Sequence, residues 1–310
     1  MTYSMKVKEE ICRLNINRME ALSELTAIIR YDALIKPNSI TLTFESGAIA
    51  KRVYKDIKSI FNLSAHITVR NQKRFRAKQV YILEIKEHAT TVLERLHIMK
   101  GQKMLKMNRT DLDTREEMVA FVRGAFLVTG SLNDPATSKY HLEYVFDNPK
   151  DAESFNKLLH EMKFDTKVLT RNSKYMVYLK SADEISDMIR MFGTPNSLFY
   201  FEDVRIYRDH KNMVNRLNNC EIANQEKTLQ AGLKQVKDIE YLQEHDLTDL
   251  LDEKTRIVME YRLKYPESSY QELATIIGME TGYTIGKSGI NHHFIKIKNL
   301  RKMHEEQANS

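Results

Sequence analysis

Hydrophobic and polar positions in the N-terminal part of the chain describe one series of elements twice. Apolar residues at helical spacing predict a helix over residues 19–31 and another over residues 116–129. Each is followed by alternating apolar and polar positions, which are typical of a strand, over residues 39–44 and 140–146. An amphipathic helix, two strands and a closing helix come next in both copies. The pattern therefore predicts an internal duplication.

The later elements of the two copies support this interpretation. The hexapeptide that begins at His66 ends in Arg-Asn, as does the hexapeptide that begins at Lys167. Strands mixed with helices in this order predict an α+β fold, in which two repeats pack about a pseudo-twofold axis. We place this duplicated domain at residues 1–204. Its repeats cover about residues 15–100 and 114–200.

After residue 204 the pattern becomes helical. Apolar residues at steps of three and four predict one or two helices over residues 213–242. Since no Pro-rich or Gly/Ser-rich run separates the two parts, we expect a fairly stiff helical linker over residues 205–245.

A compact all-α domain is predicted over residues 246–310. A helix over residues 252–263 ends before Pro266, whose ring cannot continue it. Ser269 and Glu272 form a capping-box pattern that starts a short helix, and Gly278 is expected to end that helix. A third helix is predicted from about residue 286 to about residue 303. Short helix, turn and longer helix make a helix-turn-helix.

The third helix carries an unusual charge pattern. Residues 284–302 hold five Lys or Arg residues and no Asp or Glu, in a chain with 42 acidic residues. Such a helix can enter the major groove of DNA, where Asn suits adenine and Lys suits guanine or phosphate. The alternative is a basic, exposed helix of an ordinary three-helix domain. The candidate DNA-binding residues are Ser269, Gln271, Lys287, Ser288, Asn291, His292, Lys296, Lys298, Arg301 and Lys302.

A second basic cluster lies at the start of the predicted linker. Its position between two candidate DNA-binding parts favours a secondary DNA contact, and a solvated helix face explains it equally well. The cluster consists of Arg205, Arg208, Lys211 and Arg216.

Composition narrows the function classes. The net charge of +6 over 310 residues is a weak indication of a polyanionic partner. The chain has no apolar run long enough for a membrane helix and no apolar leader, so we expect a cytoplasmic protein. Cys12 and Cys220 do not suggest a disulfide framework, and no His falls at metal-ligand spacing. We expect no metal and no cofactor.

The first helix of each repeat resembles a worn LAGLIDADG motif, the central helix of homing endonucleases. The matching segments are residues 25–35 and 122–132. In that fold the two helices pack together, and each delivers one acidic residue to the metal ions that cut DNA. The matching positions here are Asp32 and Thr129, and only the first is acidic. Because two-metal cleavage needs several anionic oxygens, we expect no nuclease activity.

Longer strings resemble the WhiA family of bacterial regulators. They are residues 123–135, 215–224, 265–274 and 287–292. The resemblance implies an αββαββ-type LAGLIDADG-like half that does not cut, joined to a DNA-binding helix-turn-helix. It also implies roles in cell division, chromosome segregation and, in sporulating relatives, transcription of sporulation genes.

Three departures from the family pattern matter. Gly286 stands where Ser is usual, and should still serve as a helix N-cap. His293 and Phe294 replace an Arg-Leu pair, which implies the loss of one phosphate contact. Asp32 is an acid where members commonly have none.

The main hypothesis is a non-catalytic, nucleoid-associated regulator whose partner is double-stranded DNA, with other regulatory proteins as further partners. An architectural or partner-binding protein is the first alternative, and a metal-dependent endonuclease acting through Asp32 is the second. The sequence leaves the oligomeric state and the DNA site open.

Overall fold

The computed structural model describes residues 1–72, 78–108 and 111–308. The chain divides into two compact units, Met1–Arg208 and Asp209–Ser310. Among the described helices, none has the length and apolar character that a membrane-spanning segment needs.

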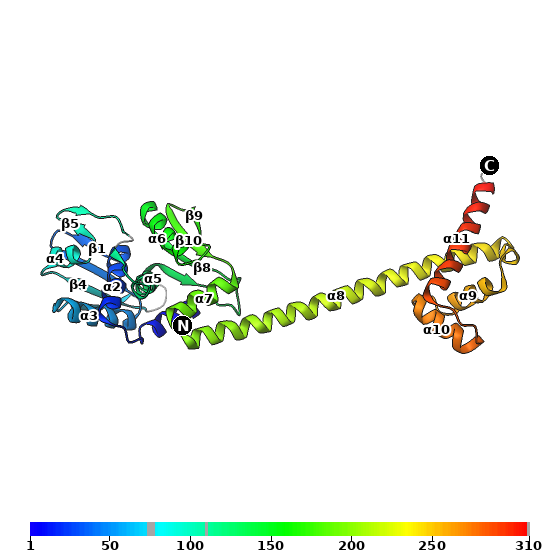
Figure 1. The fold of residues 1–310 in the computed structure, drawn as a ribbon, viewed down its shortest axis with the longest axis horizontal. Helices are drawn as coiled ribbons and strands as arrows, with labels where there is room; N and C mark the ends of the chain where they lie inside the picture. The colour runs from blue at the N-terminus through cyan, green and yellow to red at the C-terminus, as the bar shows by residue number, and fades with distance from the viewer. Residues whose placement is uncertain (73–77, 109–110, 309–310) are drawn as a thin grey trace. The chain divides into compact units, whose positions relative to one another are not determined.

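The N-terminal unit contains the two repeats, and each repeat has a four-stranded antiparallel sheet (Figure 1). The strand order is β1-β2-β4-β3 in the first sheet and β7-β8-β10-β9 in the second, so the topology is the same. A short helix, α1 (Tyr3–Ile11), comes before the repeats, and a small hairpin, β5 (Met99–Lys100) and β6 (Lys103–Met104), lies between them in sequence.

The elements of the first repeat are α2 (Arg18–Asp32), β1 (Leu34–Lys36), β2 (Ser39–Phe44), α3 (Gly47–Phe61), β3 (His66–Gln72), β4 (Lys78–Ile85) and α4 (Ala89–Arg95). Those of the second are α5 (Arg115–Thr129), β7 (Gly130–Leu132), β8 (Leu142–Phe146), α6 (Pro149–Glu161), β9 (Lys167–Arg171), β10 (Lys174–Leu179) and α7 (Ala182–Phe192). The predicted α+β duplication is confirmed. The order derived from the residue pattern missed β1 and β7, because three residues are too few to show alternation. The αββαββ order implied by the family resemblance includes both strands.

Helices α2 and α5 pack side by side at the centre of the unit (Figure 1). Gly124 makes this close approach possible, since a Cβ atom there would lie 2.2 Å from the carbonyl oxygen of Glu24. The Glu24 side chain is fully buried, and the Arg52 guanidinium pairs with it through Nη2 at 3.0 Å from Oε2. The seam between the repeats is therefore tight, and the buried ion pair beside it ties α2 to α3 within the first repeat.

Helix α8 (Pro195–Glu244) is one helix of 50 residues. It starts well before residue 205, where the linker was expected to begin. The Glu10 carboxylate of α1 accepts hydrogen bonds from the backbone N–H groups of Asn196 at 2.9 Å and Ser197 at 3.0 Å, and so satisfies free amides of the first turn. This cap joins residues far apart in sequence, which explains why the local pattern did not reveal it.

The C-terminal unit is all helical, as predicted. After the end of α8 come a 3-10 turn (Thr248–Leu250), α9 (Glu253–Lys264), α10 (Tyr270–Thr281) and α11 (Lys287–Ala308). Ile239 and Leu242 of α8 belong to the same apolar core as the three later helices, so the last turns of α8 form part of this unit.

The predicted end of α10 was wrong. The helix continues through Gly278 to Thr281 and ends at Gly282, whose φ of +73° is the left-handed conformation that favours glycine. Gly278 is an interior helical residue, which costs about 1 kcal/mol relative to Ala and is tolerated here. α11 also runs past residue 303, to Ala308.

Candidate nucleic-acid interface

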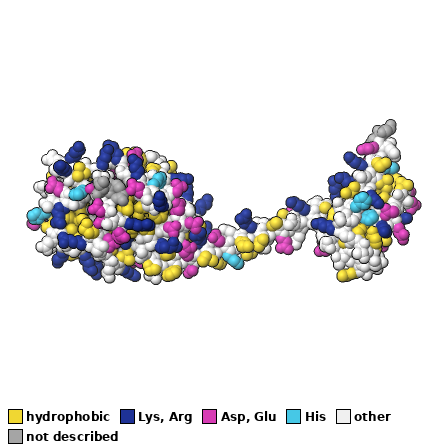
Figure 2. Space-filling model, viewed as in Figure 1, with side chains coloured by type: hydrophobic (Ala, Val, Ile, Leu, Met, Phe, Trp, Pro, Cys, Tyr) yellow, Lys and Arg dark blue, Asp and Glu magenta, His cyan; other side chains and the backbone are white. Residues whose placement is uncertain are grey.

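One face of α11 packs into the core of the C-terminal unit, and the opposite face is exposed to solvent. Ile290, Phe294 and Ile297 are at most 5% exposed and pack into the C-terminal core. The exposed side carries Lys287, Ser288, Asn291, His292, Lys298 and Lys302, at steps that keep them on one broad face. In Figure 2 several Lys and Arg side chains gather on one side of the C-terminal unit, beside His side chains. The structure thus brings six of the predicted residues together.

Two residues on this face were missed by the sequence analysis. Ile295 is 47% exposed, and Asn299 is also exposed. They lie one and two helical turns after Asn291, in the same line. An outward apolar side chain can contact a thymine methyl group, and a second amide can read a base edge. Four-residue spacing from Asn291 could have identified both.

Lys296 and Arg301 have partners within the protein. Lys296 Nζ lies 3.0 Å from Asp252 Oδ2, at the N-terminus of α9. This hydrogen bond, together with those from Thr255, holds the pKa of Asp252 below its usual range. Arg301 Nη1 lies 2.8 Å from Asp238 of α8 and its Nε lies 2.8 Å from Glu305. Both cations therefore fasten α11 to its neighbours.

His293 and Phe294 point inward, so neither side chain of this pair lies on the exposed face of α11. His293 is 8% exposed, and its Nδ1 lies 2.8 Å from the Thr255 hydroxyl. Burial lowers the pKa of His293. Phe294 stacks on Tyr270, with ring centroids 5.6 Å apart. Neither position could reach DNA from the exposed face.

The start of α10 forms the second part of the surface. Ser269 Oγ accepts from the Glu272 N–H at 3.2 Å, and Glu272 Oε2 accepts from the Ser269 N–H at 2.7 Å, so the predicted capping box is present. The Ser269 N–H holds the pKa of Glu272 below its usual range. A cavity of about 300 Å³ lies beside this helix start, lined by Lys227, Gln271 and Lys287 among others. Cations beside a helix N-terminus suit a phosphate group.

Arg262 holds this corner of the unit in shape. It is 1% exposed, and its Nη1 donates to the carbonyl oxygens of Tyr265, Pro266 and Ser268. The guanidinium also lies over the Phe294 ring, 5.2 Å from its centroid. One buried cation therefore organises the turn that leads into α10.

The four residues of the predicted secondary DNA contact fall into two groups, one with partners in the protein and one exposed. Arg205 pairs with Asp183, and Arg208 Nη1 donates to the carbonyl oxygens of Pro135 at 2.6 Å and Ser138 at 2.7 Å. Both arginines therefore bind partners within the N-terminal unit. Lys211 and Arg216 are exposed on α8 and make no ion pair with any described residue.

The two LAGLIDADG positions do not form a metal site in the described residues. The Thr129 hydroxyl donates to the Ala125 carbonyl oxygen at 2.9 Å within α5. Asp32 ends α2 near Lys8, which is 9% exposed. Desolvation raises the pKa of Asp32 to about 6 and Lys8 opposes the rise, while burial lowers the pKa of Lys8 to about 8. No cluster of three or more His, Cys, Asp or Glu side chains fit for a metal occurs in the part of the chain that the structure describes.

The fold and this surface define a class of protein, in which a two-repeat LAGLIDADG-like unit is followed by a helix-turn-helix unit. Family models match in the same order: the WhiA N-terminal LAGLIDADG-like domain at residues 18–99, the WhiA LAGLIDADG-like domain at residues 118–211 and the WhiA C-terminal HTH domain at residues 214–301. The chain belongs to the WhiA family.

Relatives agree with this assignment over nearly the whole chain. Proteins of Staphylococcus aureus strains JH9 and Newman, called probable cell division protein WhiA, are each 35% identical over 305 residues, which is 97% of this chain and 96% of theirs. The crystal structure of full-length WhiA from Thermatoga maritima has 22% identity and a TM-score of 0.57, and covers 98% of this chain and 99% of that one. It supports the fold.

Proposed function

We propose that the protein is a non-catalytic bacterial regulator that binds double-stranded DNA with sequence preference. The observation that carries the proposal is the outward face of α11, where Asn291, Ile295 and Asn299 form a line flanked by lysines. Amide and apolar groups read base edges, whereas lysines contact phosphates and set the register. The cavity beside the start of α10 would receive one phosphate of the same duplex.

The family supports the cellular part of the proposal. Relatives carry the name probable cell division protein, which supports a role in cell division. Our proposal extends this role to chromosome segregation, at the nucleoid in the cytoplasm. In a sporulating host it would also control transcription of sporulation genes. Other regulatory proteins are the further partners we expect.

Selection of preferred sites from random duplexes, followed by binding isotherms, tests the proposal. We expect a specific site bound far more tightly than random DNA, and Asn291→Ala should lose about 1–3 kcal/mol on that site. A Lys287→Ala/Asn291→Ala double variant should lose the preference. Gln230→Ala/Lys237→Ala, which removes an exposed amide and an exposed lysine of α8, should keep it. Equal affinity of the wild type for all sequences would favour the architectural alternative.

The absence of catalysis is tested separately. Supercoiled plasmid incubated with the protein and Mg²⁺ or Mn²⁺ should stay intact, because Asp32 stands beside a buried lysine and Thr129 supplies no carboxylate. Cleavage that disappears in Asp32→Ala would instead support the endonuclease alternative.

A further inference from the structure

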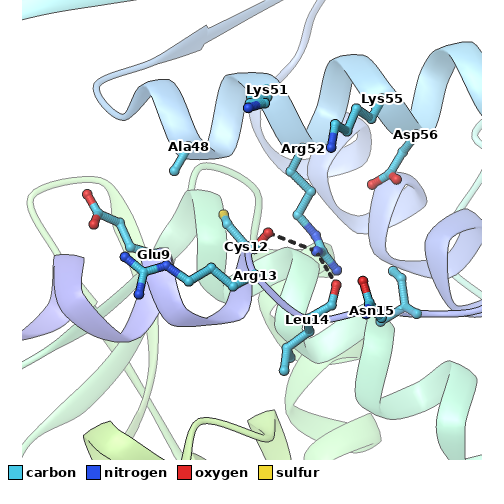
Figure 3. A pocket seen from close by; sticks show the side chains of 11 residues that line it. Glu9, Cys12, Arg13, Leu14, Asn15, Ala48, Lys51, Arg52, Lys55 and Asp56 are labelled. Carbon is cyan, nitrogen blue, oxygen red and sulfur yellow. Dashed lines mark hydrogen bonds between the residues drawn. The ribbon is translucent and has the colours of Figure 1, made fainter.

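The N-terminal unit holds a cavity of about 550 Å³ that the proposed DNA surface does not use (Figure 3). Its walls are the end of α1, the loop that follows and one side of α3. Its size falls within the range of small-molecule sites. The residues that line it are Glu9, Cys12, Arg13, Leu14, Asn15, Ile16, Ala48, Lys51, Arg52, Lys55 and Asp56.

Arg52 gives this cavity a fixed wall. Its side chain is 6% exposed and pairs with the buried Glu24. The same guanidinium donates through Nη1 to the carbonyl oxygens of Leu14 at 3.0 Å and Cys12 at 3.4 Å, as Figure 3 shows. These bonds tie the loop between α1 and α2 to α3. A wall fixed before binding reduces the entropy that a ligand must lose.

Three other cationic side chains line the cavity. Arg13, Lys51 and Lys55 are exposed, and none of them makes an ion pair with a described residue. Lys51 and Lys55 stand one helical turn apart on α3, and Arg13 comes from the opposite wall. Arg52 is already paired with Glu24, and the acidic residues of the lining are Glu9 and Asp56. A recess lined mainly by one sign of charge concentrates ions of the opposite sign, here anions.

Asp56 adds a polar group without a partner. Its Oδ2 atom is buried and accepts no hydrogen bond within the described protein. Burial, and next the nearby Glu24, raise the pKa of Asp56 to about 7. A buried oxygen left unsatisfied is costly. Asp56 also lines the cavity, so N–H donors of a ligand can approach its carboxylate. Leu14, Ile16 and Ala48 provide apolar surface in the same recess.

We propose that this cavity binds a small phosphorylated ligand of nucleotide size. The phosphate would lie against Lys51, Lys55 and Arg13, and the N–H groups of the base would face the Asp56 carboxylate. The base would cover the apolar wall. This site is separate from the DNA surface of α11, so the proposed function neither requires it nor depends on it.

Isothermal titration calorimetry with the full chain tests the site. The probes are the mono- and diphosphates of adenosine and guanosine, with inorganic phosphate as the minimal anion. We expect one equivalent of a nucleotide to bind saturably, with affinity at least about tenfold weaker in Lys51→Ala/Lys55→Ala, which lacks two charge-assisted contacts. Lys58→Ala, an exposed lysine of α3 outside the cavity lining, should bind as the wild type does.

Asp56→Asn separates the two halves of the site. It should weaken nucleotide binding and leave the weaker binding of inorganic phosphate unchanged. Without ligand, the Lys51→Ala/Lys55→Ala variant should unfold like the wild type, within the small change in stability that surface substitutions usually cause. The proposal is overturned if no nucleotide binds saturably at millimolar concentration, or if the Lys51→Ala/Lys55→Ala variant binds as tightly as Lys58→Ala.

Discussion

At the residue scale, the charge pattern of α11 predicted which side of the helix faces outward but not how each cation is used. Lys298 and Lys296 are both exposed lysines of one helix, and the sequence treats them alike. Only the structure shows that Lys296 is paired with Asp252, 44 residues away in the chain. Partners this far apart leave no local pattern, so the sequence could not separate the cations that hold the fold from those available to DNA.

This difference gives a paired prediction. Lys298→Ala should weaken binding to all duplexes and reduce the slope of log affinity against log salt by about one unit, since each phosphate contact releases counterions. Lys296→Ala should leave the slope nearly unchanged, because its charge is already balanced by Asp252. Fluorescence anisotropy over a salt series measures both slopes. The same slope in the wild type and in Lys298→Ala would mean that this residue does not meet phosphate.

Asp56 gives a pH prediction. Its pKa is about 7 in the folded protein, above the ordinary 3.8, so the native state holds the proton more tightly than the unfolded chain between these values. The stability it confers is present at low pH and lost as pH rises through 7. Asp56→Asn should therefore be more stable than the wild type at pH 8. We expect a difference of about 1–2 kcal/mol, less than the full pKa shift would give, because solvent partly screens Asp56.

Urea unfolding from pH 4 to pH 8 measures this effect. The gap between Asp56→Asn and the wild type should close at the acidic end of the series. A gap that is constant with pH, or that widens toward pH 4, would contradict the sign of the shift.

At the element scale, the sequence predicted what depends on neighbouring residues. Helical spacing located α2 and α5, alternation located β2 and β8, and a capping box located the start of α10. It missed the ends set by distant contacts, such as the start of α8, which Glu10 caps. The sequence pattern also assigned the end of α10 to Gly278 instead of Gly282. The difference between these two glycines lies in their backbone conformation, which the sequence does not show.

Two helical glycines, Gly124 of α5 and Gly278 of α10, give an element-scale prediction in which the second substitution is the control for the first. Gly124→Ala should destabilise the N-terminal unit by about 3 kcal/mol, because its Cβ would meet the Glu24 carbonyl and force α2 and α5 apart. Gly278→Ala should stabilise α10 by about 0.5–1 kcal/mol, since its nearest neighbour would be 3.8 Å away and the backbone is helical. Thermal unfolding followed by circular dichroism distinguishes them. A neutral Gly124→Ala would mean that the seam can relax.

At the scale of the whole molecule, the two units divide the expected functions. The N-terminal unit has two LAGLIDADG-like repeats with no metal cluster among its described residues, and the C-terminal unit carries the outward face of α11, which has no acid from Lys287 to Lys302. The sequence predicted this division from an internal repeat followed by a change of pattern. The change of pattern does not mark the end of a fold, however, because α8 begins in the first unit and supplies Ile239 and Leu242 to the core of the second.

The division yields a prediction about fragments. A fragment of residues 209–310 retains every member of the C-terminal apolar core, including Ile239 and Leu242, and should fold alone. We expect it to keep the base preference of the full chain, because the outward residues of α11 are all present. Residues 1–208 should show no such preference. Anisotropy with the selected site and a scrambled duplex measures both fragments against the full chain. A folded 209–310 fragment that binds both duplexes equally would place the base preference in the N-terminal unit and remove α11 from that role.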